Sequence, residues 1–203
     1  MGARAEELEL RGGQVCSRGK VALTLKQAAS RLRVDRLSEQ AERQGDYGGE
    51  RHDGYGGVQI CDVAVDTGTG VVKVERVVAV YECGRVINPL ATQSQINGGI
   101  LQGLSWALYE ERQLDAATGR MVNANLEQYK IAGAKEVPQI EVVLLEQYQG
   151  RNATDANGIG EPANIPTAAA IANAVYNAIG VRLRELPMRP AVVLAALARG
   201  GHR

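Results

Sequence analysis

The fold of this chain is decided by three consecutive segments: Val58-Gln-Ile-Cys-Asp-Val-Ala-Val-Asp66, the tetrapeptide Thr67-Gly-Thr-Gly70, and the long run from Val71 to Tyr81. The first segment alternates apolar side chains on one face with Asp62 and Asp66 on the other, which is typical of a half-buried strand. The tetrapeptide predicts a turn, and the run after it is rich in β-branched residues. We therefore expect the two outer segments to form a hairpin.

A helix is expected after the hairpin, over about residues 91–110. Its apolar residues recur at every fourth position, at Ile96, Ile100, Leu104 and Leu108. Trp106 is also expected in the core. Beside the apolar residues runs a stripe of small ones, Gly99, Gly103 and Ala107. Such a stripe allows another backbone or a ligand to approach the helix closely.

The rest of the chain alternates between expected strands and helices. A turn at residues 115–120 predicts a second hairpin, and residues 139–146 predict a strand. A helix that begins with Asn164 as its N-cap follows, then a strand over 181–185 and a helix over 190–198. The predicted fold class is therefore α+β, with mixed or antiparallel sheets and packed helices.

The first 57 residues differ from the rest. They offer a short strand near residues 9–11 and helical spacing over 23–32, and they end in a stretch, 45–57, with six glycines among thirteen residues. So many glycines cannot form a regular element. We expect residues 1–57 to be an N-terminal arm with a glycine-rich hinge, and residues 58–203 to be one domain.

Charge and composition exclude several classes of function. The chain has 203 residues, with 23 Lys and Arg against 23 Asp and Glu. Phosphate and anionic lipid attract a basic excess, so this balance argues against nucleic-acid and membrane partners and for a small-molecule substrate. The charged N-terminus and the lack of a run of about 18 apolar residues predict a cytoplasmic protein. Only two His and three well-separated Cys are present, so we expect no metal ligands from side chains.

The segment Asp155-Ala-Asn-Gly-Ile-Gly-Glu-Pro162 is the first candidate for chemistry. Gly158 and Gly160 permit an unusual backbone, and Glu161 follows at once. A carboxylate on a rigid turn before a helix can act as a general base in a pocket. The alternative is a loop glutamate that only favours the dipole of the next helix.

The second candidate is Gln95-Ile-Asn-Gly-Gly-Ile-Leu-Gln-Gly103. Gln95 and Gln102 lie seven positions apart, and thus on one face of a helix, with glycines between them. This arrangement suits hydrogen bonding to a flat ligand that is rich in heteroatoms, and it equally suits close packing of another element through glycine. Cys83 is expected to be a buried, unreactive thiol, because no histidine lies near it in sequence.

Read together, these motifs resemble the molybdenum hydroxylases, the xanthine dehydrogenase/aldehyde oxidase family. The motifs occur in the family's order: Cys83-Gly-Arg-Val-Ile-Asn-Pro89, the Gln95–Gly103 segment, Tyr129-Lys-Ile131, Gly158-Ile-Gly-Glu-Pro162, Ala170-Ile-Ala-Asn-Ala-Val-Tyr-Asn-Ala178 and Val181-Arg-Leu-Arg-Glu-Leu-Pro187. The resemblance is to the C-terminal part of the molybdopterin-binding subunit and covers about residues 58–197.

The resemblance implies roles for individual residues. Glu161 falls on the catalytic glutamate, which acts as general base while water-derived oxygen is inserted into a C–H bond of an aldehyde or N-heterocycle. Gln95 and Gly160 are implied to contact the cofactor, molybdenum–molybdopterin in its plain or dinucleotide form. The 2Fe–2S centres and FAD are expected on other domains or subunits.

Two departures from the family pattern are visible. Gln128-Tyr-Lys-Ile-Ala132 stands where relatives usually have Asp-Tyr-x-Ile-Pro, and Glu82 where they often have Asp. The family's upstream motifs, which hold most of the pterin, have no counterpart here. The chain is therefore expected to be a piece of a split or truncated subunit, inactive without the remaining half and without iron–sulfur and flavin subunits. The alternative is a non-catalytic assembly or interaction module that retains the fold.

Overall fold

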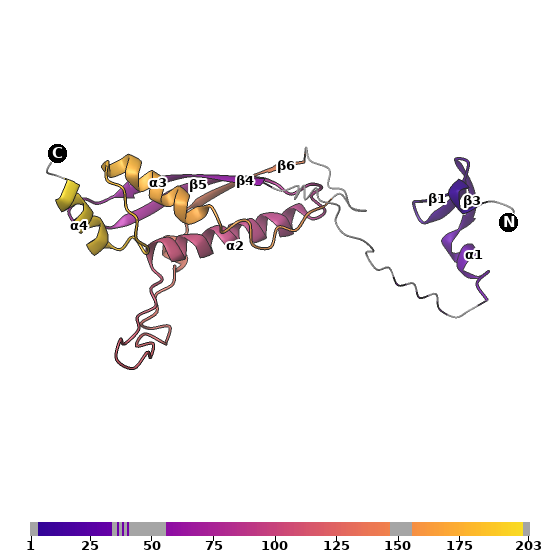
Figure 1. The fold of residues 1–203 in the computed structure, drawn as a ribbon. Helices are drawn as coiled ribbons and strands as arrows, with labels where there is room; N and C mark the ends of the chain where they lie inside the picture. Colours follow the sequence, from indigo (N-terminus) through magenta and orange to yellow (C-terminus); the bar gives the residue numbers. More distant parts are fainter. Residues whose placement is uncertain are drawn as a thin grey trace, which may run out of the picture. The chain divides into compact units, whose positions relative to one another are not determined.

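The computed structural model describes residues 4–33, 36, 38, 40, 56–146 and 156–200. By their contacts, the residues divide into two units, Met1–Glu50 and Arg51–Arg203 (Figure 1). Most of the stretch predicted to be a glycine-rich hinge, residues 45–55, lies outside the described residues.

The first unit is a small antiparallel sheet with short helical turns. It contains η1 (Ala5–Glu7), β1 (Leu8–Arg11), β2 (Gln14–Ser17), β3 (Lys20–Thr24) and α1 (Leu25–Ala29), and the strand order is β1-β2-β3. The Gly12-Gly13 turn joins β1 to β2, and both glycines are in the left-handed region that favours this residue. Thr24 caps α1 in a reciprocal capping box with Gln27.

The second unit is built on a three-stranded sheet of order β4-β5-β6. β4 (Gly56–Val65) and β5 (Val72–Glu82) pair antiparallel, which confirms the predicted hairpin, and β6 (Gln139–Leu145) joins β5 in parallel. The turn between β4 and β5 is held by Asp66, whose Oδ1 accepts hydrogen bonds from the backbone N–H groups of Gly68 and Thr69. These hydrogen bonds lower the pKa of Asp66.

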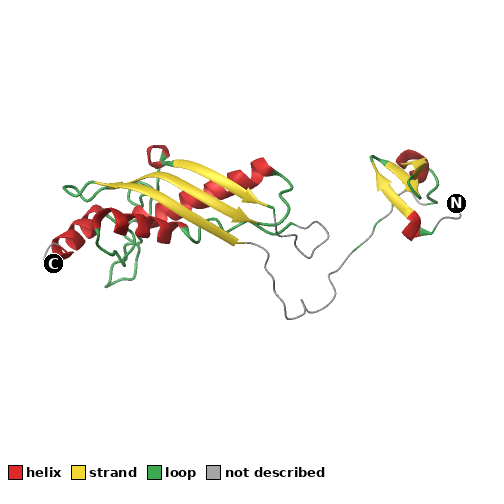
Figure 2. Ribbon diagram, turned by 90° about the horizontal axis from the view of Figure 1, so that it is seen from above, coloured by secondary structure: helices red, strands yellow, loops and turns green. Residues whose placement is uncertain are grey.

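The main helices of this unit cover one face of the sheet. They are α2 (Pro89–Leu108), α3 (Thr167–Ile179) and α4 (Pro190–Gly200), with the short η2 (Ala134–Glu136) before β6. Figure 2 looks onto the other face and shows the strands in front of the helices. Asn88 caps α2, because its Oδ1 accepts the N–H of Ala91. None of the helices in the described ranges is long and apolar enough to cross a membrane.

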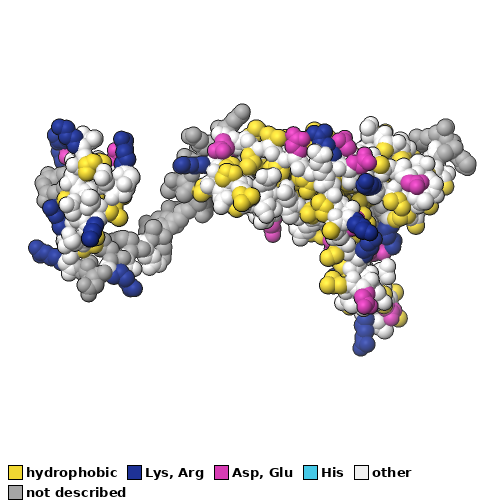
Figure 3. All heavy atoms as spheres, turned by 180° about the vertical axis from the view of Figure 1, so that it is seen from behind, with side chains coloured by type: hydrophobic (Ala, Val, Ile, Leu, Met, Phe, Trp, Pro, Cys, Tyr) yellow, Lys and Arg dark blue, Asp and Glu magenta, His cyan; other side chains and the backbone are white. Residues whose placement is uncertain are grey.

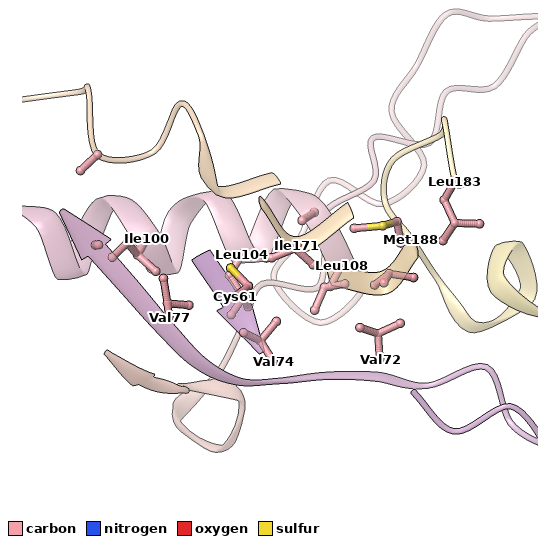
Figure 4. Close-up of a cluster of buried hydrophobic side chains, with 14 of the residues drawn as sticks. Cys61, Val72, Val74, Val77, Ile100, Leu104, Leu108, Ile171, Leu183 and Met188 are labelled. Carbon is pink, nitrogen blue, oxygen red and sulfur yellow. The ribbon is translucent and has the colours of Figure 1, made fainter. Parts of the chain in front are cut away.

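The core lies between this sheet and the helices (Figure 4). The predicted apolar face of α2 is confirmed, since Ile96, Ile100 and Leu104 are fully buried and Leu108 is almost so. They pack against inward-facing residues of β5 and against α3, including Val77 and Ile171. The predicted α+β class with mixed sheets is confirmed.

Four local predictions need correction. Residues 181–185 form no strand: Leu183 is buried, but no neighbouring strand pairs with this segment in the described part of the chain. Asn164 does not cap α3, because that helix begins after Pro166 and the Asn164 side chain bonds to Gln102. Trp106 is 41% exposed rather than in the core. The turn predicted at residues 115–120 is present, since the N–H of Asp115 donates to the carbonyl of Arg120, but the flanking strands are reduced to a single bridge between Leu114 and Met121.

Residues 110–133 form an irregular arm that projects from the end of α2 (Figures 1 and 3). Its base is held by the buried Asn123 side chain, which accepts the N–H of Gln113 at 3.0 Å and donates to the carbonyl of Glu111 at 2.7 Å. Arg189 also forms an ion pair with Glu111, which ties the arm to the segment before α4.

Candidate active site

The loop that carries Glu161 begins beside the end of β5. Ala156 pairs with Gly84 in an antiparallel bridge, and the N–H of Asn157 donates to the carbonyl of Cys83 at 2.9 Å. Cys83 therefore supports the loop through its backbone. Its side chain is 3% exposed, and burial, followed by the charges of Glu82 and Glu146, raises the pKa of its thiol. The prediction of a buried thiol is confirmed.

Helix α2 holds the same loop through two side-chain amides. Gln95 Nε2 donates to the carbonyl oxygen of Gly160 at 2.6 Å, and Gln102 Oε1 accepts from Asn164 Nδ2 at 3.0 Å. Gln95 and Gly160, both predicted to contact the cofactor, are thus brought together in the structure. The two hydrogen bonds fix the loop on either side of Glu161.

The glycine stripe of α2 accommodates the backbone of this loop. A Cβ atom added to Gly99 would lie 2.7 Å from Ala163 Cβ and 3.1 Å from the Asn164 nitrogen. A Cβ atom added to Gly103 would lie 2.5 Å from Thr167 Cβ. Of the two interpretations that the sequence left open for the stripe, close packing therefore holds at both positions.

A buried polar cluster that the sequence analysis missed lies beneath the loop. Gln59 Nε2 donates to the carbonyl of Ala163 at 2.7 Å and to Tyr81 Oη at 2.9 Å, and the Tyr81 hydroxyl is itself 3.3 Å from that carbonyl. Gln59 and Tyr81 are 8% and 1% exposed. Burial raises the pKa of Tyr81, against a smaller lowering by the hydrogen bond from Gln59. One sequence signal existed: Gln59 is a polar residue at an inward-facing position of β4, in step with Cys61.

The outward side of the loop is open. Gly158, Gly160 and Glu161 are all exposed, and a Cβ atom added to either glycine would have no heavy atom within 4 Å. Among the described residues, the carboxylate of Glu161 makes no hydrogen bond or ion pair. The loop therefore presents bare backbone and a free carboxylate on one side, while α2, Gln59 and Tyr81 hold it from the other.

Two further features bear on the choice of site. In the described ranges, no group of three His, Cys, Asp or Glu side chains could hold a metal ion. A cavity of about 480 Å³ lies at the far end of α2, lined by residues that include Leu108, Tyr109, Lys130 and Met188. It does not include Glu161, and its charged residues Lys130, Arg189, Glu111 and Glu136 balance. We therefore place the candidate site at the Glu161 loop.

Comparison with known proteins identifies the family. The sequence profile of the molybdopterin cofactor-binding domain matches residues 1–138, which is more than half of the chain. The chain belongs to this family of molybdenum hydroxylase domains. The family resemblance predicted from the motifs is thereby confirmed.

Curated relatives and solved structures agree with this assignment. The chain is 38% identical over 134 residues to the xanthine dehydrogenase molybdenum-binding subunit of Escherichia coli. The match covers 66% of the chain and 18% of that protein. It is 39% identical over 142 residues to one of the subunits of nicotinate dehydrogenase from Pseudomonas putida, covering 70% of the chain and 12% of that protein. The chain thus spans less than a fifth of the length of these relatives.

Among solved structures, the aldehyde oxidoreductase of Desulfovibrio desulfuricans superimposes with a TM-score of 0.64 at 35% identity. The superposition covers 70% of this chain and 15% of that one. The comparison shows the shared fold and assigns no role to an individual residue of this chain.

Proposed function

We propose that this chain supplies one wall of the molybdenum-cofactor site of a hydroxylase that inserts water-derived oxygen into a C–H bond of an aldehyde or N-heterocycle. The observation that carries the proposal is the loop of residues 156–166, whose free carboxylate and bare glycine backbone face outward while three elements hold it from behind. A carboxylate held in this way is suited to general-base catalysis.

The residues present fit a molybdenum–molybdopterin cofactor. The open space over Gly158 and Gly160 lets a flat ligand approach the peptide groups directly. The metal in this cofactor is carried by the pterin dithiolene rather than by protein side chains. When bound, the cofactor supplies the redox chemistry and the electrophilic metal, and the side chains of the loop supply binding and proton transfer.

In this proposal, Glu161 accepts a proton at one of its carboxylate oxygens, and its neighbours fix where that carboxylate stands. One N–H of Gln95 Nε2 donates to the carbonyl of Gly160, which fixes the orientation of the amide. The amide oxygen of this exposed side chain can then accept a hydrogen bond from the cofactor. Ala163, held by Gln59, fixes the loop on the other side of Glu161.

The complete enzyme requires more than this chain. We propose that residues 58–203 form the C-terminal part of the molybdopterin-binding unit and that residues 1–57 are an arm joined to it. The remaining half of that subunit would hold most of the pterin and select the substrate. Iron–sulfur and flavin domains or subunits would carry the electrons away, so the chain alone is expected to be inactive.

The test is to co-express the chain with the polypeptide of the same genome that matches the remaining part of the Escherichia coli subunit, together with its iron–sulfur and flavin partners. Turnover is measured on a panel of aldehydes and N-heterocycles, at matched molybdenum content. Glu161→Gln is expected to reduce kcat by about 10²–10⁴-fold, the usual contribution of a general base.

Glu75→Gln is the matched control, because Glu75 is exposed near the turn end of β5, the end opposite to Cys83, which anchors the loop. It is expected to keep wild-type turnover. An unchanged rate in Glu161→Gln would overturn the assignment of the base. A complex without molybdenum and without turnover would favour the alternative, a non-catalytic module that retains the fold.

A further inference from the structure

The second face of the β4-β5-β6 sheet carries an exposed aliphatic patch. Within residues 56–146 and 156–200 no helix lies over it, as the view onto this face shows (Figure 2). Six aliphatic side chains point outward from the three strands: Val58, Ile60, Val78, Val80, Val143 and Leu145. Val58 and Ile60 are 59% and 62% exposed. We call these six residues the bare face.

The residues of the bare face are contiguous. In the sheet register, Val58 pairs with Val80 and Val80 with Val143, so these three form one row across the strands. Ile60 pairs with Val78 in the next row, which ends in the exposed Glu141 on β6. Neighbouring rows of aliphatic side chains make one continuous patch, whereas scattered surface aliphatics need no explanation.

The bare face occupies one end of the sheet only. Toward the turn between β4 and β5, the outward positions of β5 are charged, with Lys73, Glu75 and Arg76 exposed. Arg76 also pairs with Glu141 at 2.7 Å. An antiparallel sheet with a solvated face alternates apolar and polar residues along its whole length. Here the outward positions of β5 are charged at the turn end and aliphatic at Val78 and Val80, with Glu82 as the charged residue at the far end.

The apolar end is the one nearest to the candidate site. Val80 lies three residues before Cys83, whose carbonyl anchors the Glu161 loop. The loop itself lies on the helix-covered face, where Gln59 and Gln95 hold it, so a layer on the bare face would enclose the same end of the sheet from the opposite side. The relatives contain a polypeptide that could form this layer, because more than four-fifths of their length lies outside the matched region.

We propose that the bare face is the docking surface for the remaining part of the molybdopterin-binding subunit, which covers it with an apolar layer of its own. This inference rests on the proposed function for the identity of the partner. The competing occupants are a second copy of this chain and the small unit of residues 4–33, and measurements of complex formation, dimerisation and truncation separate them.

The experiment measures binding of the full chain to the polypeptide of the same genome that matches the remaining part of the Escherichia coli subunit. Both are produced in a host that makes no molybdopterin, so complex formation is read independently of the cofactor. Ile60→Lys and Val143→Lys place a charge on different strands of the bare face, at positions where the native side chains are 62% and 37% exposed. Each is expected to weaken binding at least about tenfold, since a desolvated charge is costly.

Ala178→Lys is the control, because Ala178 is exposed on α3, in the layer behind the sheet. It is expected to bind as the wild type does. Circular dichroism and thermal melting show that each variant is folded. Light scattering of the full chain alone, with the same variants, reports a dimer.

Loss of the complex in both bare-face variants, with the control intact, supports the proposal. A wild-type chain that forms no complex, or a complex that survives both variants, overturns it. So does a dimer of the chain alone that Ile60→Lys dissociates, since a second copy is then the occupant. Binding that rises when residues 1–33 are removed overturns it in favour of the small unit. A complex that depends on the bare face and yet takes up no molybdenum in a competent host refutes the proposed function and leaves the docking surface standing.

Discussion

Two adjacent glycines of α2 provide a matched pair of substitutions. A Cβ atom added to Gly98 meets no heavy atom within 4 Å, whereas one added to Gly99 lies 2.7 Å from Ala163 Cβ and 3.0 Å from the Ala163 carbonyl carbon. Both glycines are in the interior of the helix, so the change in helix propensity is the same for both. Any difference between the alanine variants therefore reports the packing of the loop against α2.

The expected magnitudes follow from these contacts. Alanine is favoured over glycine in a helix interior by about 1 kcal/mol, so Gly98→Ala should raise the free energy of unfolding by about that amount. Forcing a methyl group into a packed contact costs about 1–3 kcal/mol. Gly99→Ala should therefore lie between no net change and a loss of about 2 kcal/mol. The two variants should differ by about 1–3 kcal/mol.

Urea unfolding followed by tryptophan fluorescence measures this difference directly. Trp106 is the only Trp of the 203 residues and lies on α2, so its signal comes from the second unit alone. Equal stabilisation by Gly98→Ala and Gly99→Ala would refute the close contact between α2 and the loop that carries Glu161. Close packing against α2 would then not be what positions Glu161.

Two further predictions concern the buried groups around the site. Tyr81→Phe removes a hydroxyl that lies 2.9 Å from Gln59 Nε2 and 3.3 Å from the Ala163 carbonyl. It should lower the free energy of unfolding by about 1 kcal/mol in the same fluorescence assay. An unchanged free energy of unfolding would contradict the buried polar cluster. Burial, followed by the charge of Asp62, raises the pKa of Cys61 from 9.0 to about 11. Because the folded-state pKa of Cys61 is raised, the protonated thiol contributes its full share to the free energy of unfolding below pH 9. This contribution is lost as the pH rises toward 11. Cys61→Val should therefore remove part of the alkaline loss of stability, and an identical pH dependence in the variant would count against this burial.

Much of the second unit could be predicted from local patterns. The four-residue spacing from Ile96 to Leu108 defined the buried face of α2 because a single helix decides it. The β4-β5 hairpin was equally local, since Asp66 and its neighbours form the turn within a few residues. The parallel pairing of β6 with β5 could not be predicted from the sequence, because α2 and residues 110–133 separate the two strands along the chain.

The wrong predictions share one physical origin, because each depended on a partner that lies far away in the sequence. Alternation in residues 181–185 predicted a strand, but a strand requires a partner, and this segment satisfies its apolar positions by burying Leu183 without one. Asn164 has the side chain of an N-cap, yet Gln102 on α2 binds it instead. Likewise, the role of Gln59 depends on a carbonyl 104 positions away, so no local pattern could assign it.

The claim that matters most is that Gly158, Gly160 and Glu161 face a molybdenum cofactor, and molybdenum content tests it most directly. Gly160→Val leaves the carbonyl that binds Gln95 in place, and the backbone at Gly160 is not in the left-handed region, so the chain should fold and assemble normally. Its side chain would nevertheless fill the open space over the loop. We predict that the assembled wild-type complex and the control Ala178→Val carry stoichiometric molybdenum and that Gly160→Val loses most of it. Full molybdenum in Gly160→Val, or none in the wild type, would contradict the account.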